Sequence, residues 1–433
     1  MGPNRAWLAS GLVALCTMGA AAQEEGPSTD ALVRQGLISL QSRNIPAAQQ
    51  YLERAIRQSP DEARAWIGLA QIYRVLNLHA KASRHASEAA RLGEDDPLIQ
   101  HALSMFYTDY GDFAEAARWE EKFARGERGS HDAFLRAATL YLEAGMPLRA
   151  TEVGEAALET ETGESAEVHN LLGKAYTTAH RPEDGLRHLR LAVELGRYQE
   201  SFHYDLGHFH LLAGEFDAAR AAFLAGRQYF DKSPALEIGL GIVAYQERRF
   251  DDAVGSFLRA SELAPAMEQP HAFLGRLLQH AVRRMDEVEK RLRIFHKEHS
   301  RNHFGPFLYG QVLLARTGSR PDPESLSGIE SLLRESIRLK EDFWESHYEL
   351  GVLFEKKRDF QLAEQHFERA AALNPNASKP HYRLARIYRR LGKSREAKRR
   401  RELHKRIAEE EREAMRAGRL PADLGGPPAP DGR

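Results

Sequence analysis

The stretch WESHYELGVLFEKKRDFQLAEQHFERAAALNPNA, residues 344–377, decides the fold of this chain. Its first half spaces His347, Leu350, Gly351 and Phe354 three or four residues apart, which is the period of one face of a helix. Its second half repeats that spacing with small and aromatic residues, and a proline follows near the end, where a helix cannot continue. The stretch therefore predicts two helices joined by a turn.

The same order of residue types recurs along the chain. It runs as a large residue, Leu, Gly or Ala and an aromatic residue, followed by Ala, an aromatic residue, Ala and Pro. The clearest further copies are Trp66, Leu69, Ala70, Tyr73 and Ala82; His203, Leu206, Gly207, Ala219 and Phe223; and Glu237, Leu240, Gly241, Ala253, Phe257, Ala260 and Pro265. This pattern resembles the tetratricopeptide repeat family, in its exported bacterial form. The resemblance implies an all-α, right-handed superhelical solenoid whose concave wall is lined by the first helix of each unit.

The repeat register predicts about eleven helix-turn-helix units over residues 29–411, each about 34.8 residues long. One hairpin cannot bury its apolar face alone, so neighbouring units must stack. The match is weaker in units three, four and eight, where Glu120, Gly154 and Arg291 stand near the slot of a large packed residue. The predicted unit starts are Thr29, Ala63, Pro97, His131, Ala166, Glu200, Pro234, Glu268, His303, Trp344 and Ser378.

Composition and charge limit the classes of function. The 433 residues are 42% hydrophobic and 28% charged, which is typical of a folded protein and excludes collagen-like, mucin-like and wholly disordered chains. The formal net charge is −1, so no global electrostatic field draws the chain to nucleic acid. Any electrostatic preference must therefore be local, and we expect no nucleic-acid partner.

The first 22 residues read as a signal peptide. Arg5 precedes an apolar run over residues 6–17, and Ala20 to Ala22 offer a cleavage site before Gln23. We expect an exported, periplasmic or secreted protein with a short linker at residues 23–28; the alternative is a lipid anchor at Cys16. Because Cys16 is the only cysteine, the cleaved chain would have no disulfide, thiolate metal site or cysteine nucleophile.

No known catalytic motif stands in the sequence, so we expect neither enzymatic activity nor a cofactor. A zinc site at His296, His299 and His303 was the alternative, but a helix end expected near residues 300–302 would break their shared face, so no metal is expected. Five further histidines recur at the fourth position of their units, which indicates packing rather than chemistry. They are His169, His203, His271, His347 and His381.

The family resemblance implies a partner-binding groove on the first helices of the units. Apolar and aromatic residues at groove positions would hold a peptide segment. The alternative is that the solenoid coils tightly or fills its own groove. The predicted groove residues are Tyr204, His208, Leu211, Ile238, Ile242, Tyr245, Phe304, Phe307 and Gln311.

The last unit presents a basic wall at the same positions. Lys379 and Arg383 resemble one part of the clamp with which some family members hold a carboxylate, but Phe307, Gln311 and Glu349 stand where the rest would need Lys and Asn. The predicted wall is Lys379, Arg383, Arg386, Arg389 and Arg390.

A charged helix follows the basic wall. It carries Lys398 to Arg401 and Glu409 to Glu411, a pattern typical of a solvated cap, with contact to an anionic surface as the alternative. Residues 412–433 read as the end of that capping helix and a disordered Pro/Gly tail.

Together these patterns predict a non-catalytic scaffold of the cell envelope that binds other proteins or peptide segments. Because the predicted signal peptide implies export, we expect these partners to be envelope proteins. The alternative is an adaptor that binds an anionic polymer or membrane surface through the basic C-terminal region.

Overall fold

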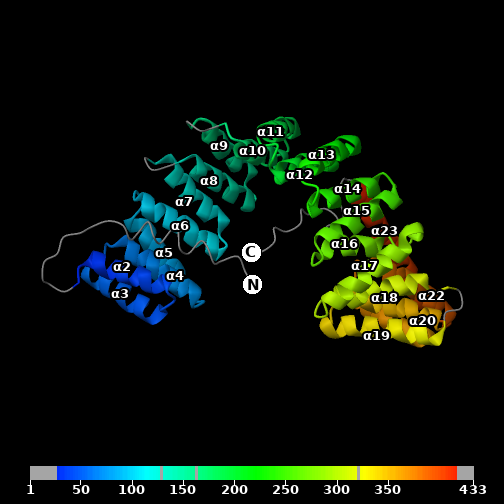
Figure 1. Ribbon diagram of the computed structural model, residues 1–433. Coiled ribbons are helices and arrows are strands. Elements are labelled where there is room, and N and C mark those ends of the chain that lie inside the picture. Colours follow the sequence, from blue (N-terminus) through cyan, green and yellow to red (C-terminus); the bar gives the residue numbers. More distant parts are fainter. Residues whose placement is uncertain (1–26, 127–129, 161–163, 319–321, 417–433) are drawn as a thin grey trace. The chain divides into compact units, whose positions relative to one another are not determined.

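The structure is a computed structural model that describes residues 27–126, 130–160, 164–318 and 322–416. Over these residues it is all-α, with helices α2 to α23, one 3-10 helix and no strand (Figure 1). The predicted signal peptide, Cys16 and the tail beyond residue 416 lie outside the described residues. Within the described part of the chain, no helix combines the length and the apolar character needed to cross a lipid bilayer.

The described chain divides into two compact units, with the boundary in sequence between Leu206 and Gly207 inside α12. The first unit contains five helix pairs and the start of α12. These pairs are α2 (Thr29–Gln41) with α3 (Ile45–Gln58), α4 (Ala63–Val75) with α5 (His79–Leu92), α6 (Pro97–Tyr110) with α7 (Phe113–Arg125), α8 (His131–Glu143) with α9 (Pro147–Leu158), and α10 (Ala166–Thr178) with α11 (Pro182–Leu195).

The second unit begins within α12 and continues the same alternation. Its helices are α12 (Glu200–Leu212), α13 (Phe216–Tyr229), α14 (Pro234–Gln246), α15 (Phe250–Leu263), α16 (Glu268–Arg276), η1 (Val282–Arg284), α17 (Met285–Glu298), α18 (Phe304–Arg316), α19 (Pro323–Leu339), α20 (Trp344–Lys356), α21 (Phe360–Leu373), α22 (Ser378–Arg390) and α23 (Ser394–Arg416).

The repeat register is confirmed by the helix boundaries. Ten of the eleven unit-opening helices begin at the predicted residue; the ninth begins at Phe304 rather than His303. Side-chain caps start many of the helices, as where Asp96 accepts a hydrogen bond from the backbone N–H of Leu98 at 2.8 Å.

Glycine at the eighth position allows the two helices of a unit to approach. A Cβ atom on Gly351 would lie 2.6 Å from the ring of Phe367, and one on Gly207 would lie 2.5 Å from the ring of Phe223. Both rings are fully buried. The small residue therefore makes room for an aromatic side chain from the second helix of the same unit.

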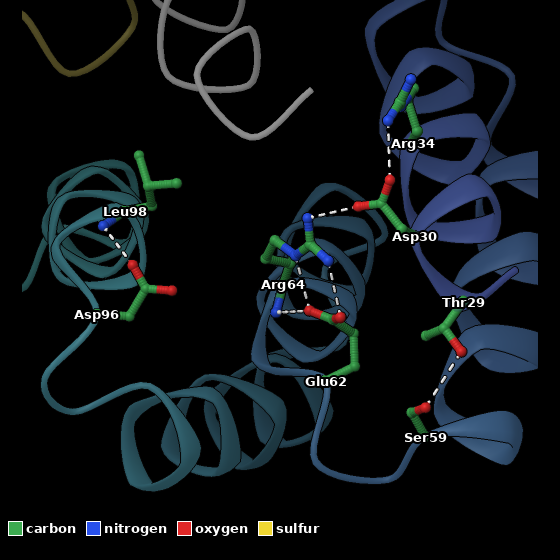
Figure 2. Close-up of polar contacts among 8 residues, drawn as sticks. All are labelled: Thr29, Asp30, Arg34, Ser59, Glu62, Arg64, Asp96 and Leu98. Atoms are coloured by element: carbon green, nitrogen blue, oxygen red, sulfur yellow. Dashed lines mark hydrogen bonds and ion pairs between the residues drawn. The ribbon is translucent and has the colours of Figure 1, made fainter. Parts of the chain in front are cut away.

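Polar contacts also follow the repeat. Figure 2 shows Arg64 between two carboxylates: its Nη1 lies 2.9 Å from Asp30 of the preceding unit, and its Nε lies 2.8 Å from Glu62. Asp30 and Arg64 are 34 residues apart, one repeat length. Thr29 and Ser59 add a hydroxyl contact of 3.1 Å in the same region. The contact between Asp30 and Arg64 joins the first two repeats, and the contact between Thr29 and Ser59 lies within the first.

Candidate functional site

Most of the predicted apolar groove is packed inside the protein. Tyr204, Leu211, Ile238, Ile242 and Phe307 are buried, and Ile238 has no exposed surface at all. Their expected exposure on a wet wall is therefore wrong. The physical reason is that each side chain fills space beside the neighbouring helices, so the apolar face serves the core.

The remaining predicted groove residues keep some contact with water. Tyr245 is 38% exposed, while His208, Phe304 and Gln311 are half-buried. Gln311 donates a hydrogen bond from Nε2 to the Glu349 carboxylate at 2.9 Å. Burial raises the pKa of Glu349, against the effect of that hydrogen bond and of the charges on Lys379 and Arg383.

The basic wall is only partly available to a partner. Arg383 and Arg386 share the carboxylate of Glu355, at 2.9 Å and 3.3 Å respectively. Arg390 lies over the ring of Phe360, with 5.2 Å between the guanidinium carbon and the ring centroid. Lys379 and Arg389 are exposed. Positive charge is therefore accessible at the start of α22, on Lys379, and near its end, on Arg389.

The last two described helices, α22 and α23, are labelled in Figure 1. Residues of both helices line a basic pocket. Its volume is about 560 Å³. Among the residues that the structure describes, five cationic side chains line it and no acidic one does. The residues lining this basic pocket are Tyr382, Ala385, Arg386, Arg389, Ala397, Lys398, Arg401, His404 and Lys405.

Local packing fixes the two walls of the basic pocket. The ring of His404 lies 5.3 Å from that of Tyr382, and its Nδ1 lies 3.2 Å from the backbone carbonyl of Ser378. The Ser378 hydroxyl donates to the Glu411 carboxylate at 2.8 Å. These contacts tie the start of α22 to the far half of α23, so the cations are presented by two helices held together.

Two sequence predictions meet in this pocket. Arg386 and Arg389 belong to the predicted basic wall, and Lys398 and Arg401 belong to the charged helix that is predicted as a solvated cap, with contact to an anionic surface as the alternative. The missed signal is spacing: Lys398, Arg401 and Lys405 recur at three and four residues and so share a face of α23. That face lies against the wall on α22.

A second pocket, of about 450 Å³, lies between α6 and α8 with α7 beneath it. It contains Glu120, one of the residues that departed from the repeat pattern. Glu120 is 1% exposed, and its carboxylate oxygens lie 2.9 Å from Nδ1 of His101 and 2.7 Å from Nε of Arg136. The departure from the repeat thus marks a buried ionic cluster.

The recurrent histidines lie in helix contacts. His169 and His271 are buried, and His381 donates a 2.9 Å hydrogen bond from Nε2 to the backbone carbonyl of Pro375. Helix α17 ends at Glu298, before His299 and His303. In the described ranges, no group of three or more His, Cys, Asp or Glu side chains is arranged to hold a metal ion.

Comparison with known families identifies the repeat. Tetratricopeptide repeat models match residues 33–97, 204–268, 344–377 and 366–399. The third of these ranges is the stretch that decided the fold from sequence. No protein of curated function matches this sequence.

Several solved structures match parts of this chain at low TM-scores. Yeast Tom70 is 14% identical with a TM-score of 0.42, and the match covers 90% of this chain and 94% of that chain. The MamA protein is 23% identical with a TM-score of 0.34, covering 39% and 91%. PilF of Pseudomonas aeruginosa is 18% identical with a TM-score of 0.31, covering 57% and 96%. The similarity to tetratricopeptide repeats is therefore carried by the sequence matches.

Proposed function

We propose that this chain, which carries tetratricopeptide repeats, is a non-catalytic scaffold that binds acidic segments of other proteins. The basic pocket between α22 and α23 supports this proposal: five cationic side chains converge on it, and its described lining has no acidic residue. Aspartate and glutamate side chains of a partner would complement that charge, and the arginines could hold a carboxylate with two donors at once.

Because most of the predicted apolar groove is buried, charged residues are the better candidates for contact with a partner. Large aromatic anchors such as Phe307 are already packed within the chain, so they are not available as a first contact. Arg389, in contrast, is exposed beside the pocket. We therefore expect partner association to be steered by charge and to weaken as salt rises.

We further propose that the scaffold works in the cell envelope, because residues 1–22 have the order of a signal peptide. The envelope also supplies the competing ligand class. An anionic polymer or membrane surface would present negative charge to the same pocket, and the absence of acidic residues from its described lining favours that second function too.

Charge reversal tests the scaffold. The variant Arg389→Glu, Lys398→Glu, Arg401→Glu would be titrated against a fluorescent peptide of six glutamates, in the full-length protein, by fluorescence anisotropy. Reversing three exposed arginines or lysines elsewhere, by Arg190→Glu, Lys290→Glu and Arg293→Glu, makes the same change in net charge and serves as the control.

We expect the pocket variant to lose at least about tenfold in affinity and the control variant to lose less than about threefold. Equal losses of affinity in both variants would mean that the peptide responds only to the net charge of the protein, and the proposed site would be wrong. Vesicles containing phosphatidylglycerol, titrated in parallel, test the second function: tighter retention of vesicles than of the peptide, lost in the pocket variant, would favour the surface adaptor.

A further inference from the structure

A polar pocket of about 590 Å³ lies among the helices of the sixth and seventh repeats. Its sides are formed by α13 and α15, the second helices of these repeats, and its floor is formed by α14, which packs against both. This volume is within the range of small-molecule sites. We call it the arginine pocket, because its lining includes Arg220, Arg227, Arg249, Arg259 and Arg284.

The arginine pocket is separate from the predicted groove. Its floor includes Leu240 and Val243 of α14, which are buried. Successive residues of a helix are rotated by about 100°, so these two residues lie on the opposite face of α14 from the predicted groove residues Ile238 and Ile242. A ligand in this pocket would therefore not occupy the groove that the repeat pattern predicts.

One end of the arginine pocket is neutralised by ion pairs within the protein. The Glu247 carboxylate lies 2.5 Å from Nη1 of Arg220 and 3.0 Å from Nη1 of Arg249. Nη2 of Arg249 also lies 2.5 Å from the carboxylate of Asp252. This end therefore offers both hydrogen-bond donors and acceptors, which is what the hydroxyl groups of a ligand require.

The other end of the arginine pocket has cations that are not neutralised in this way. Arg259 is exposed and makes no hydrogen bond or ion pair with any residue that the structure describes. Arg227 approaches its partner Glu237 only to 3.5 Å. Because α13 and α15 are the second helices of successive repeats, they run in the same direction, and both arginines lie in the last two turns of their helices. Two guanidinium groups thus line the same end.

A hydroxyl group and a further guanidinium stand beside Arg259. Ser256 precedes it by one turn of α15, and its hydroxyl has no hydrogen-bond partner within the described ranges. Arg284 donates to Glu287 from Nε at 3.0 Å and from Nη2 at 2.7 Å, which leaves Nη1 for another acceptor. Gly255 gives that nitrogen its space, since a Cβ atom there would lie 2.5 Å from it.

These donors match the oxygens of a phosphate ester. The planar guanidinium of arginine presents paired N–H donors that fit phosphate geometry, and a serine hydroxyl adds another donor. In the part of the lining that the structure describes, five arginines face three carboxylates, so a dianion balances the excess positive charge. A carboxylate, with one negative charge, balances only half of it.

We propose that the arginine pocket binds a small phosphorylated polyol, such as a sugar phosphate. The phosphoryl group lies between Arg227, Arg259 and Ser256. The hydroxyl groups reach Arg249 and Asp252 at the ion-paired end, and the C–H face of the polyol packs on the apolar floor. This inference goes beyond the scaffold function and does not depend on the basic pocket.

Three soluble esters serve as probes: glucose 6-phosphate, ribose 5-phosphate and glycerol 3-phosphate. Each would be titrated into the full-length protein by isothermal titration calorimetry. We expect saturable binding of at least one ester with a dissociation constant on the order of 0.1 mM. The matching unphosphorylated polyol and inorganic phosphate should each bind at least about tenfold more weakly, because each lacks one half of the contacts.

Arg259→Gln is the decisive variant, since Arg259 has no partner in the described chain and its loss leaves no buried charge unpaired. Arg293→Gln is the matched control. Arg293 holds the same position on α17, one repeat later, is also exposed and unpaired within the described residues, and lies outside the pocket lining. Affinity for the ester should fall at least about tenfold in the first variant and stay within about twofold in the second. Arg259→Lys, which keeps the charge but loses the paired donors, should fall between them.

Four results would overturn the inference. The first is the absence of saturable binding of all three esters up to about 10 mM, well above the expected dissociation constant. The second is an equal loss of affinity in Arg259→Gln and Arg293→Gln. The third is ester binding that survives Arg259→Gln but is lost when Arg389, Lys398 and Arg401 are changed to Glu, which would place the ester in the basic pocket. The fourth is retention on vesicles containing phosphatidic acid, lost in Arg259→Gln, without binding of the free esters, which would assign the phosphoryl group to a lipid headgroup.

The same variants separate this inference from the proposed function. The charge reversal at Arg389, Lys398 and Arg401 should weaken the glutamate peptide and leave ester binding intact. Arg259→Gln should weaken the ester and leave the peptide unchanged within about twofold.

Discussion

His169 of α10 and His188 of α11 bring their Nδ1 atoms to 2.9 Å of each other inside the fifth repeat. The same relationship recurs in the tenth repeat, where Nδ1 of His347 lies 3.3 Å from Nδ1 of His366. In each pair one ring nitrogen donates and the other accepts, so at least one ring of the pair must be neutral at that nitrogen. Both contacts join the two helices of a unit.

These histidine pairs predict a loss of stability in mild acid. Burial, and then the neighbouring imidazole, lowers the pKa of His188 to about 4. An unfolded histidine has a pKa of about 6.5, so the unfolded state takes up the proton first as pH falls. Stability is therefore complete above pH about 6.5 and is lost between about 6.5 and 4. From pH 7.5 to 5, His188 alone should cost about 2 kcal/mol of unfolding free energy.

Urea unfolding of the full-length protein, followed by circular dichroism at pH 7.5 and pH 5, measures this loss. In His188→Gln the difference between the two pH values should shrink, because the group that titrates has been removed. Comparing each variant with itself at the two pH values cancels any cost of the substitution that does not depend on pH. A pH difference as large in His188→Gln as in the parent protein would contradict the prediction.

The close approach of Gly351 and Phe367 predicts the sign of two glycine substitutions. Gly351→Ala should destabilise by about 1–3 kcal/mol, because the new methyl group would lie 2.6 Å from a fully buried ring. Gly328→Ala, on an exposed face of α19 with no heavy atom within 4 Å, should stabilise by about 0.5–1 kcal/mol. Thermal melting measures both, and equal signs would count against the packing described.

The ionic cluster at the floor of the pocket between α6 and α8 predicts that loss of the buried Glu120 carboxylate lowers the stability of the protein. Loss of an exposed carboxylate should leave the stability nearly unchanged. Glu120→Gln should cost about 1–3 kcal/mol, because Arg136 and His101 lose a charged acceptor. Glu152→Gln, at a side chain that is 56% exposed and paired with Arg149, should change stability by less than about 0.5 kcal/mol. Similar effects of both changes on the melting temperature would disprove the cluster's role.

The fold could be predicted from the sequence because the same local contacts repeat in each unit. A glycine such as Gly351 and an aromatic residue such as Phe367 recur at fixed spacing. The close packing of these two residues involves only the two helices of one repeat. The ninth start was missed by one residue, since His303 lies before the helix rather than within it. Repeated local contacts are thus readable from one sequence.

The binding surface was less readable for the opposite reason. The solvent exposure of Ile238 and Phe307 depends on how closely side chains from neighbouring helices pack against them. The position of a residue within its repeat does not specify that packing distance. The basic pocket combines Arg389 with Lys398 across two helices, and its existence depends on how closely α22 and α23 pack. Glu120, one of three residues at which the sequence departs from the repeat pattern, lies in a buried ionic cluster that the sequence did not predict.

Export predicts a defined first residue. If residues 1–22 form a signal peptide, protein purified from its native host should begin near Gln23 and should be found outside the cytoplasm. Intact-mass measurement and N-terminal sequencing decide this. An intact Met1 in cytosolic protein would refute export, and a lipid on Cys16 would refute cleavage before Gln23. Neither result bears on whether the basic pocket binds acidic segments.

The most direct test of the central claim is crosslinking from the basic pocket in the living host. A photoreactive benzoylphenylalanine in place of Tyr382, which lines that pocket and is 48% exposed, would report what touches it. The account predicts crosslinks to an acidic segment of a protein, mapped by mass spectrometry and lost when Arg389, Lys398 and Arg401 are changed to Glu. Crosslinks to lipid or glycan instead, or protein crosslinks that survive the charge reversal, would contradict it.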